Sequence, residues 1–233
     1  MPLRIGFDMD GVLADFSTAF LEVEQRLFGA SSSVAAESPE VEASHEEDAA
    51  VRAAGGGTTP RDSRRRRDAI WKAIHGTTDF WMSLKPHDPE AVRRIHDMMI
   101  RHGWEVFFIT QRPSTLGQTV QRQTQLWLRD QGFDLPSVLV ISGSRGAAAG
   151  ALRLNFHVDD SPQNCLDVVA DSKARPILIV PEPDEITETS AKRLRIGVAR
   201  TIGEALDSLE QIAAVGKGDT RLLSRLSKIM GWD

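Results

Sequence analysis

The sequence predicts an α/β fold: a Rossmann-like three-layer sandwich with a parallel sheet between two helical layers, and a small helical cap inserted after the first strand. Two observations predict it. Short apolar runs alternate with amphipathic segments of helical period, which is typical of a parallel sheet covered on both faces. Four of these runs end in polar residues, and in an open parallel sheet ligands bind beyond the carboxyl ends of the strands.

Length and composition restrict the class of protein before any motif is considered. The 233 residues are 41% hydrophobic, enough for one core with a subsidiary lobe. The net charge of -5 does not indicate a surface for polyanions, so nucleic acid is not an expected partner. Cys165 is the only cysteine, which excludes an intramolecular disulfide and fits a reducing compartment. Without a signal-peptide pattern or a long apolar run, we expect a cytoplasmic protein with no membrane association.

The first strand, residues 3–7, is followed by the predicted cap. Apolar residues at helical spacing predict one or two helices on either side of a low-complexity stretch: Phe16, Ala19, Phe20, Val23 and Leu27 before it, and Ile70, Trp71 and Ile74 after it. The stretch itself, residues 30–62, is rich in small and acidic residues, and we expect most of it to be mobile. The basic run 64–67 is expected to be a solvated helix start that pairs with these acids rather than a polyanion contact.

Strands and helices alternate in the rest of the chain. Asp88 and Pro89 are expected to begin a helix that Gly103 ends. The helix after the next strand should carry Leu116, Val120 and Trp127 and end near Gly132. The remaining predictions are strands at 104–110, 137–142, 155–160 and 176–180 and helices at 146–152, 202–215 and 220–229. We therefore expect a core domain formed by residues 1–15 and 82–215, a cap at 16–81 and a C-terminal helix at 216–233, with the oligomeric state left open.

Polar residues gather at four predicted strand ends. They are Asp8 and Asp10 after the first strand, Thr110, Gln111 and Arg112 after the second, Ser142 to Arg145 after the third, and Asp159 and Asp160 after the fourth. Four carboxylates at one edge repel one another and require a cation between them. Because the ligands are all oxygens, a hard cation is favoured, most plausibly Mg²⁺, which tends to recruit phosphate oxygens of a small phosphorylated substrate.

This set of groups is suited to phosphoryl transfer. Asp8 could attack phosphorus as a nucleophile, and Asp10 could protonate the leaving oxygen and later deprotonate water. Thr110, with the amides at the start of a following helix, could bind phosphoryl oxygens, and Arg145 could neutralise their charge. The simpler alternatives are that Thr110 and one of Asp159 and Asp160 only cap helices.

The motifs resemble those of a known superfamily. DMDGVLADF at 8–16, FITQRP at 108–113, a basic residue before a short helix, and HVDDS at 157–161 look like motifs one to four of the haloacid dehalogenase phosphotransferases. The extended first motif and the cap between motifs one and two are similar to the 5′(3′)-deoxyribonucleotidases. The resemblance covers roughly residues 3–180 apart from the low-complexity stretch, and it implies the superfamily's α/β fold.

The resemblance also implies roles for single residues. By the resemblance, Asp8 is the nucleophile and a Mg²⁺ ligand. Asp10 is the general acid and base, and its backbone carbonyl also binds the metal. Thr110 and the backbone of Gln111 match the phosphate-binding positions. Of Asp159 and Asp160, one should bind Mg²⁺ directly and the other through water or a hydrogen bond. The third motif usually offers Lys, for which Arg145 stands here, although Arg153 also lies nearby; Arg112 could add a contact to substrate phosphate.

The substrate end of the site is less specific in sequence. By the resemblance, aromatic side chains hold a base: Phe16 matches one by position, and Phe80 or Trp81 matches another by its place before LKP. Aromatic residues at helical spacing, however, usually pack a core. His157 is expected to be a core residue and Cys165 an inert buried one. We thus expect a Mg²⁺-dependent phosphomonoester hydrolase with an aspartyl-phosphate intermediate, acting on a (deoxy)nucleoside 5′-monophosphate. The alternatives are a phosphatase for another small metabolite, a dehalogenase, and a non-catalytic regulatory or nucleic-acid-associated protein.

Overall fold

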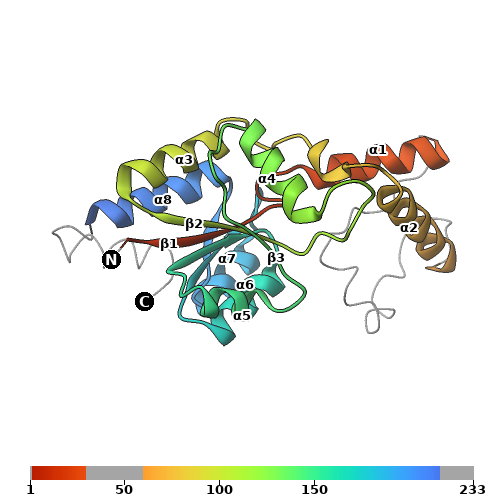
Figure 1. Ribbon diagram of the computed structural model, residues 1–233. Helices are drawn as coiled ribbons and strands as arrows, with labels where there is room; N and C mark the ends of the chain where they lie inside the picture. The colour runs from red at the N-terminus through yellow and green to blue at the C-terminus, as the bar shows by residue number, and fades with distance from the viewer. Residues whose placement is uncertain (1, 30–59, 216–233) are drawn as a thin grey trace.

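The computed structural model describes residues 2–29 and 60–215 (Figure 1). Its sheet has six parallel strands in the order β3-β2-β1-β4-β5-β6. They are β1 (Arg4–Asp8), β2 (Glu105–Thr110), β3 (Val138–Val140), β4 (Phe156–Asp159), β5 (Arg175–Ile179) and β6 (Gly197–Ala199). The predicted Rossmann-like fold class is confirmed. Because β1 lies between β2 and β4, the ends of these three strands are neighbours.

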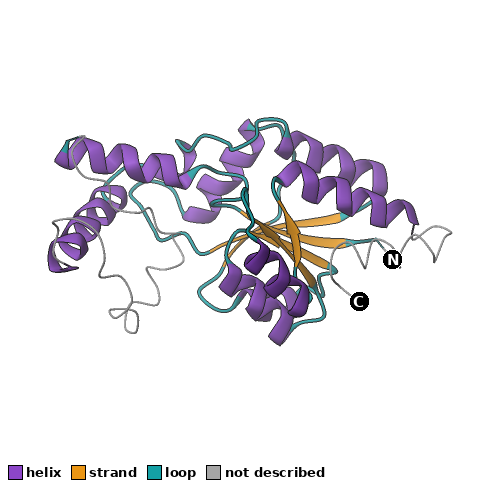
Figure 2. Cartoon of the chain, turned by 180° about the vertical axis from the view of Figure 1, so that it is seen from behind, coloured by secondary structure: helices purple, strands orange, loops and turns teal. Residues whose placement is uncertain are grey.

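Helices cover both faces of the sheet (Figures 1 and 2). The helices between β1 and β2 are α1 (Phe16–Phe28), α2 (Pro60–His75), the 3₁₀ helix η2 (Phe80–Met82) and α3 (Ala91–His102). The later ones are α4 (Val120–Asp130), α5 (Arg145–Ala151), α6 (Pro162–Asp171), α7 (Glu185–Arg193) and α8 (Ile202–Val215). In Figure 1, α3, α4 and α8 lie above the sheet, α5, α6 and α7 lie below it, and α1 and α2 project to one side. None of the described helices combines the length and apolar character needed to cross a bilayer.

The apolar core is continuous from the sheet into the projecting helices. Phe7 and Phe108 pack at a centroid distance of 6.3 Å on one face of the sheet, where α3 and α8 cover them. Phe16 of α1 stacks on Trp71 of α2 with ring centroids 5.6 Å apart, within the same cluster of buried residues. Burial of these large side chains supplies the main driving force for docking α1 and α2.

Several local predictions differ from the structure. Leu116 is 56% exposed and lies before α4, because Thr119 accepts a hydrogen bond from the Arg122 amide and caps that helix. Asp88 accepts from the Glu90 amide in a turn, and α3 begins only at Ala91. The short pair α7 and β6 was not predicted. Helix α2 begins at residue 60, within the predicted mobile stretch. Residues 30–59 of that stretch and the predicted helix at 216–233 lie outside the described residues, and the division into core and cap stays a prediction.

Helices α5 and α6 touch backbone to backbone at Gly146. A Cβ placed there would lie 2.0 Å from the Asp167 carbonyl oxygen, so the helices would have to separate. We expect Gly146→Ala to lower the free energy of unfolding by about 1–3 kcal/mol, the usual cost of overpacking. Gly203→Ala, the same change in another helix, meets only the Thr201 hydroxyl at 3.5 Å and should shift it by less than about 1 kcal/mol. Urea denaturation of both variants checks the contrast, and equal effects would contradict it.

Candidate active site

The parallel register brings the predicted motif residues to one edge of the sheet. Asp8 ends β1, Thr110 ends β2 on one side, and Asp159 ends β4 on the other. The chain then turns at Gly11, where φ is +84°, and a Cβ there would lie 1.9 Å from a carboxylate oxygen of Asp160. The Asp160 carboxylate therefore lies directly against the loop that follows Asp10. All four carboxylates of the first and fourth motifs meet at this edge.

Arg145 lies among these acids. It is the first residue of α5 and is 1% exposed; its Nη2 donates to Asp8 Oδ1 at 2.5 Å, and its Nε lies 3.5 Å from Asp159 Oδ2. Arg153, the other basic residue near the third motif, is exposed. The structure therefore places Arg145, and not Arg153, beside Asp8, the nucleophile that the sequence predicts.

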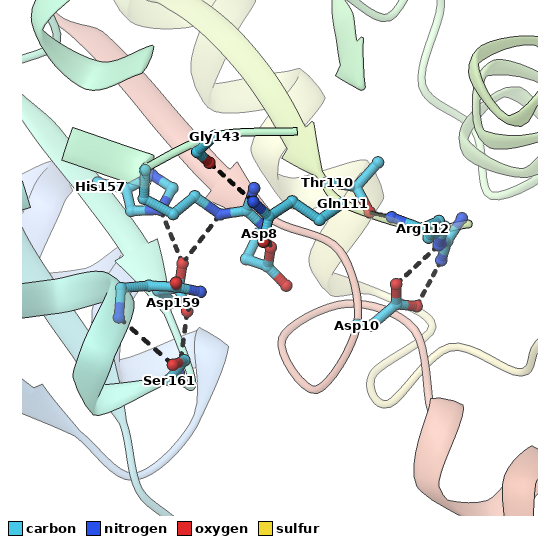
Figure 3. A network of polar contacts seen from close by, with 11 residues as sticks. Asp8, Asp10, Thr110, Gln111, Arg112, Gly143, His157, Asp159 and Ser161 are labelled. Atoms are coloured by element: carbon cyan, nitrogen blue, oxygen red, sulfur yellow. Dashed lines mark hydrogen bonds and ion pairs between the residues drawn. The ribbon is translucent and has the colours of Figure 1, made fainter. Parts of the chain in front are cut away.

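Asp159 is held on both carboxylate oxygens by the protein (Figure 3). His157 Nε2 donates to Oδ2 at 2.8 Å, while the Ser161 amide and Asn164 Nδ2 donate to Oδ1 at 2.9 and 3.1 Å. Burial disfavours the charged form, but these hydrogen bonds and the neighbouring cations outweigh it and hold the pKa of Asp159 below its usual value. Asp159 does not cap α6; Ser161 does, through the Asn164 amide.

Asp8 and Asp160 lack this compensation. Burial raises the pKa of Asp8 well above its usual value; Arg145 opposes the shift, and the other carboxylates add to it. Burial, with the charge of Asp159 as the second cause, raises the pKa of Asp160 to about 7. The described residues contain no group of three His, Cys, Asp or Glu side chains arranged as a complete metal site. Asp8 and Asp160 nonetheless offer carboxylate oxygens, and a divalent cation between them would relieve their mutual repulsion. This set of oxygen donors fits Mg²⁺.

Asp10 is paired with Arg112. The Nε and Nη2 of Arg112 donate to the two carboxylate oxygens of Asp10, both at 2.7 Å, and both side chains are buried (Figure 3). The third nitrogen of Arg112, Nη1, donates to Thr124 Oγ1 at 3.0 Å. The structure thus places the Arg112 side chain on Asp10 and Thr124, inside the protein.

The second motif continues as a loop and not as a helix. Thr110 is 1% exposed and accepts from the Arg112 amide at 3.3 Å, while Gln111 Nε2 donates to the Gly143 carbonyl at 2.7 Å. Because α4 begins only at Val120, no helix N-terminus directly follows Thr110, and the predicted help from a helix dipole there was wrong. Thr110 does not cap a helix either. A cavity of about 310 Å³ opens beside this loop and is lined by Gln111, Arg112 and the end of β3.

The three aromatic residues expected to hold a base are buried. Phe16, Phe80 and Trp81 are 2%, 4% and 0% exposed. Phe16 contacts Trp81 at a centroid distance of 5.7 Å, and Trp81 contacts Phe80 at 5.1 Å. In this conformation their faces contact one another and the core, as the packing alternative expects. A role in base stacking would need these rings to separate, and it stays a prediction.

Sequence reasoning missed two supports of the site. His157 is buried as expected, but its ring reaches Asp159 and so belongs to the site; Asn164 does the same from α6. A strand places residues i and i+2 on one face, and this spacing of His157 and Asp159 is the signal that could have found the first. Gly6 on β1 makes room for the ring, because a Cβ there would lie 2.7 Å from His157 Nδ1. The run 64–67 lies on α2, where Arg66 packs over the Phe28 ring.

Solved structures with the same fold match nearly the whole chain. A haloacid dehalogenase-like hydrolase from Streptococcus pneumoniae has a TM-score of 0.53 and 12% identity, covering 89% of this chain and 98% of its own. A candidate β-phosphoglucomutase from Thermotoga maritima has a TM-score of 0.52 and 16% identity, covering 90% of this chain and 99% of its own. A hydrolase from Pseudomonas syringae has a TM-score of 0.52 and 14% identity, covering 91% of this chain and 99% of its own. No protein-family model matches the sequence, and no curated protein is similar to it. At these identities the similarity establishes the fold alone.

Proposed function

We propose that this chain, which has the fold of the haloacid dehalogenase-like hydrolases, is a Mg²⁺-dependent phosphomonoester hydrolase that forms an aspartyl-phosphate on Asp8. The observation that supports it most is the meeting of Asp8, Asp10, Thr110, Arg145 and the Asp159–Asp160 pair at one edge of the sheet. A metabolic enzyme of this kind would work in the cytoplasm, which we propose as its location.

The residues divide the reaction into two steps. In the first, a carboxylate oxygen of Asp8 bonds to phosphorus, the ester P–O bond breaks, and Asp10 gives its proton to the departing alkoxide. In the second, water bonds to phosphorus and passes a proton to Asp10, and the P–O bond to Asp8 breaks to release inorganic phosphate. Thr110 and the Gln111 amide would bind phosphoryl oxygens throughout. Arg145 donates to Asp8 and would offset the charge that gathers there.

Asp8, the backbone carbonyl of Asp10 and Asp160 would hold the metal. Asp160 is the better candidate of the acidic pair, because both oxygens of Asp159 already accept from protein donors. When bound, Mg²⁺ would supply Lewis-acid stabilisation of phosphoryl oxygens and neutralise the carboxylates.

The substrate class that we propose is the (deoxy)nucleoside 5′-monophosphates. Support comes from the resemblance of the extended first motif, DMDGVLADF at 8–16. Phosphate release from a panel of nucleoside monophosphates, sugar phosphates and p-nitrophenyl phosphate, with Mg²⁺ and with chelator, tests both parts. Faster turnover of sugar phosphates would overturn the substrate class alone. Turnover of no phosphomonoester would overturn the proposed function.

The acidic pair can be separated by metal binding. We expect Asp160→Asn to raise the Mg²⁺ concentration for half-maximal activity by about tenfold to a hundredfold. Loss of a residue that only hydrogen-bonds a metal ligand already weakens metal binding by this much. Mg²⁺ should also raise the unfolding temperature of the wild type but much less that of Asp160→Asn. Asp159→Asn should instead lower the unfolding temperature without Mg²⁺, because His157 and Arg145 lose a charged partner. The reverse pattern would assign the metal to Asp159.

A further inference from the structure

We infer that Arg112 is a positioning residue for the acid–base carboxylate: its guanidinium fixes the orientation of Asp10, and it makes no contact of its own with the substrate phosphate. This inference rests on the proposed function and adds a residue to it. The Arg112–Asp10 pair is bidentate, with both hydrogen bonds at 2.7 Å, and the Arg112 side chain is fully buried (Figure 3).

The guanidinium is itself held in place from two further elements. Its Nη1 donates to Thr124 of α4, and its Cζ lies 4.9 Å from the ring centroid of Trp81 in η2. Trp81 is anchored in turn, because its indole Nε1 donates to the Pro113 carbonyl at 2.9 Å and its amide donates to Gln123 Oε1 at 3.1 Å. Arg112 therefore connects the core helix α4 and the base of the projecting helices to the loop that carries Asp10.

The pairing fixes the Asp10 carboxylate without using all of its lone pairs. A carboxylate has about four lone-pair sites, and the two hydrogen bonds from Arg112 use one on each oxygen. The planar fork fixes the carboxylate plane, which a single-point donor such as Lys cannot do. Asp10 stands on a loop beyond β1, so without this clamp its carboxylate could rotate away from the leaving oxygen. Each of the three guanidinium nitrogens already donates to a protein oxygen, which argues against a direct role in phosphate binding.

The leaving group of the ester distinguishes this role from a structural one. An alkyl alcohol leaves only if it is protonated, whereas p-nitrophenolate leaves with little help. The value of kcat/KM reports the barrier from free enzyme and ester through the step that breaks this bond. We expect Arg112→Met to lower kcat/KM for alkyl phosphates by about tenfold to a hundredfold, within the range that misplaced acid–base groups cost, and for p-nitrophenyl phosphate by less than about threefold.

Four comparisons complete the experiment. Arg112→Lys keeps the charge without the fork, so it should resemble Arg112→Met, and it carries the test if the Met variant does not fold. Arg112→Met added to Asp10→Asn should cause no further loss for alkyl phosphates, because both changes remove the same placed acid. Arg122→Met, the same replacement at an exposed position of α4, should leave every ester unaffected. Inhibition by inorganic phosphate should be equal in wild type and Arg112→Met.

The possible results separate the two proposals. An equal loss for all leaving groups together with weaker inhibition by inorganic phosphate would overturn the positioning role and make Arg112 a phosphate ligand. Additive losses in the double variant would overturn it as well. A wild type that turns over no ester would overturn the proposed function, and the role of Arg112 with it.

Discussion

Replacing Asp8 with Asn should abolish phosphomonoester turnover while the protein stays folded. Removing a covalent nucleophile costs about 10⁴-fold or more in kcat. Asn retains an oxygen that can accept the hydrogen bond from Arg145 Nη2, and burial already disfavours the charge at this position by raising the pKa of Asp8. The folded core should therefore tolerate the amide.

The measurement is kcat with Mg²⁺, accompanied by circular dichroism and thermal unfolding. Asp97→Asn is the matched control, because the Asp97 side chain is 71% exposed and lies on α3 away from the strand ends. It should retain full activity. If Asp8→Asn kept more than about a tenth of wild-type kcat, far above what loss of a nucleophile leaves, Asp8 would not be the nucleophile.

Replacing Arg145 with Met should reduce both activity and stability. The Arg145 guanidinium contacts both Asp8 and Asp159. Without it, these two buried carboxylates would lose a cation that offsets their repulsion from each other and from Asp160. Breaking a buried pair by removing one partner costs about 3–5 kcal/mol of unfolding free energy. Loss of a charge that stabilises the transition state costs about 10²–10³ in kcat.

Two further variants show whether the charge of Arg145 and its position cause the loss. Arg145→Lys keeps the charge and should recover part of the activity, although a single ammonium cannot reach Asp8 and Asp159 with the geometry of a guanidinium. Arg153→Met tests the other basic residue near the third motif, which is exposed and should be replaceable with little effect. Greater loss of activity in Arg153→Met than in Arg145→Met would show that the wrong arginine has been assigned.

The sheet edge could be predicted from sequence because parallel strands end on the same side. Apolar runs before Asp8, Thr110 and Asp159 were enough to place these residues together, and no long-range information was needed. Helix starts were less accurate. Thr110 and Val120 are separated by a loop that Pro113, Gly117 and the Thr119 cap could have indicated. The weak periodicity of residues 185–199 hid α7 and β6.

The connections among polar side chains could not be predicted. Whether Asp159 or Asp160 accepts from protein donors depends on strand alternation and on the placement of His157 and Asn164, which pattern alone does not reveal. The pairing of Arg112 with Asp10 joins positions 102 residues apart in sequence. Such contacts depend on packing of three elements at once, so only the structure shows them.

A direct test of the account is to look for the phosphoryl group on Asp8. The Mg²⁺-loaded protein is mixed with p-nitrophenyl phosphate or a deoxynucleoside 5′-monophosphate, quenched in acid within its turnover time, and digested for mass spectrometry. We predict an adduct with the mass of one phosphoryl group on the peptide that contains Asp8, removed by hydroxylamine and absent after chelation of Mg²⁺. Phosphate release that continues in Asp8→Asn, without an adduct on that peptide in the wild type, would contradict the account.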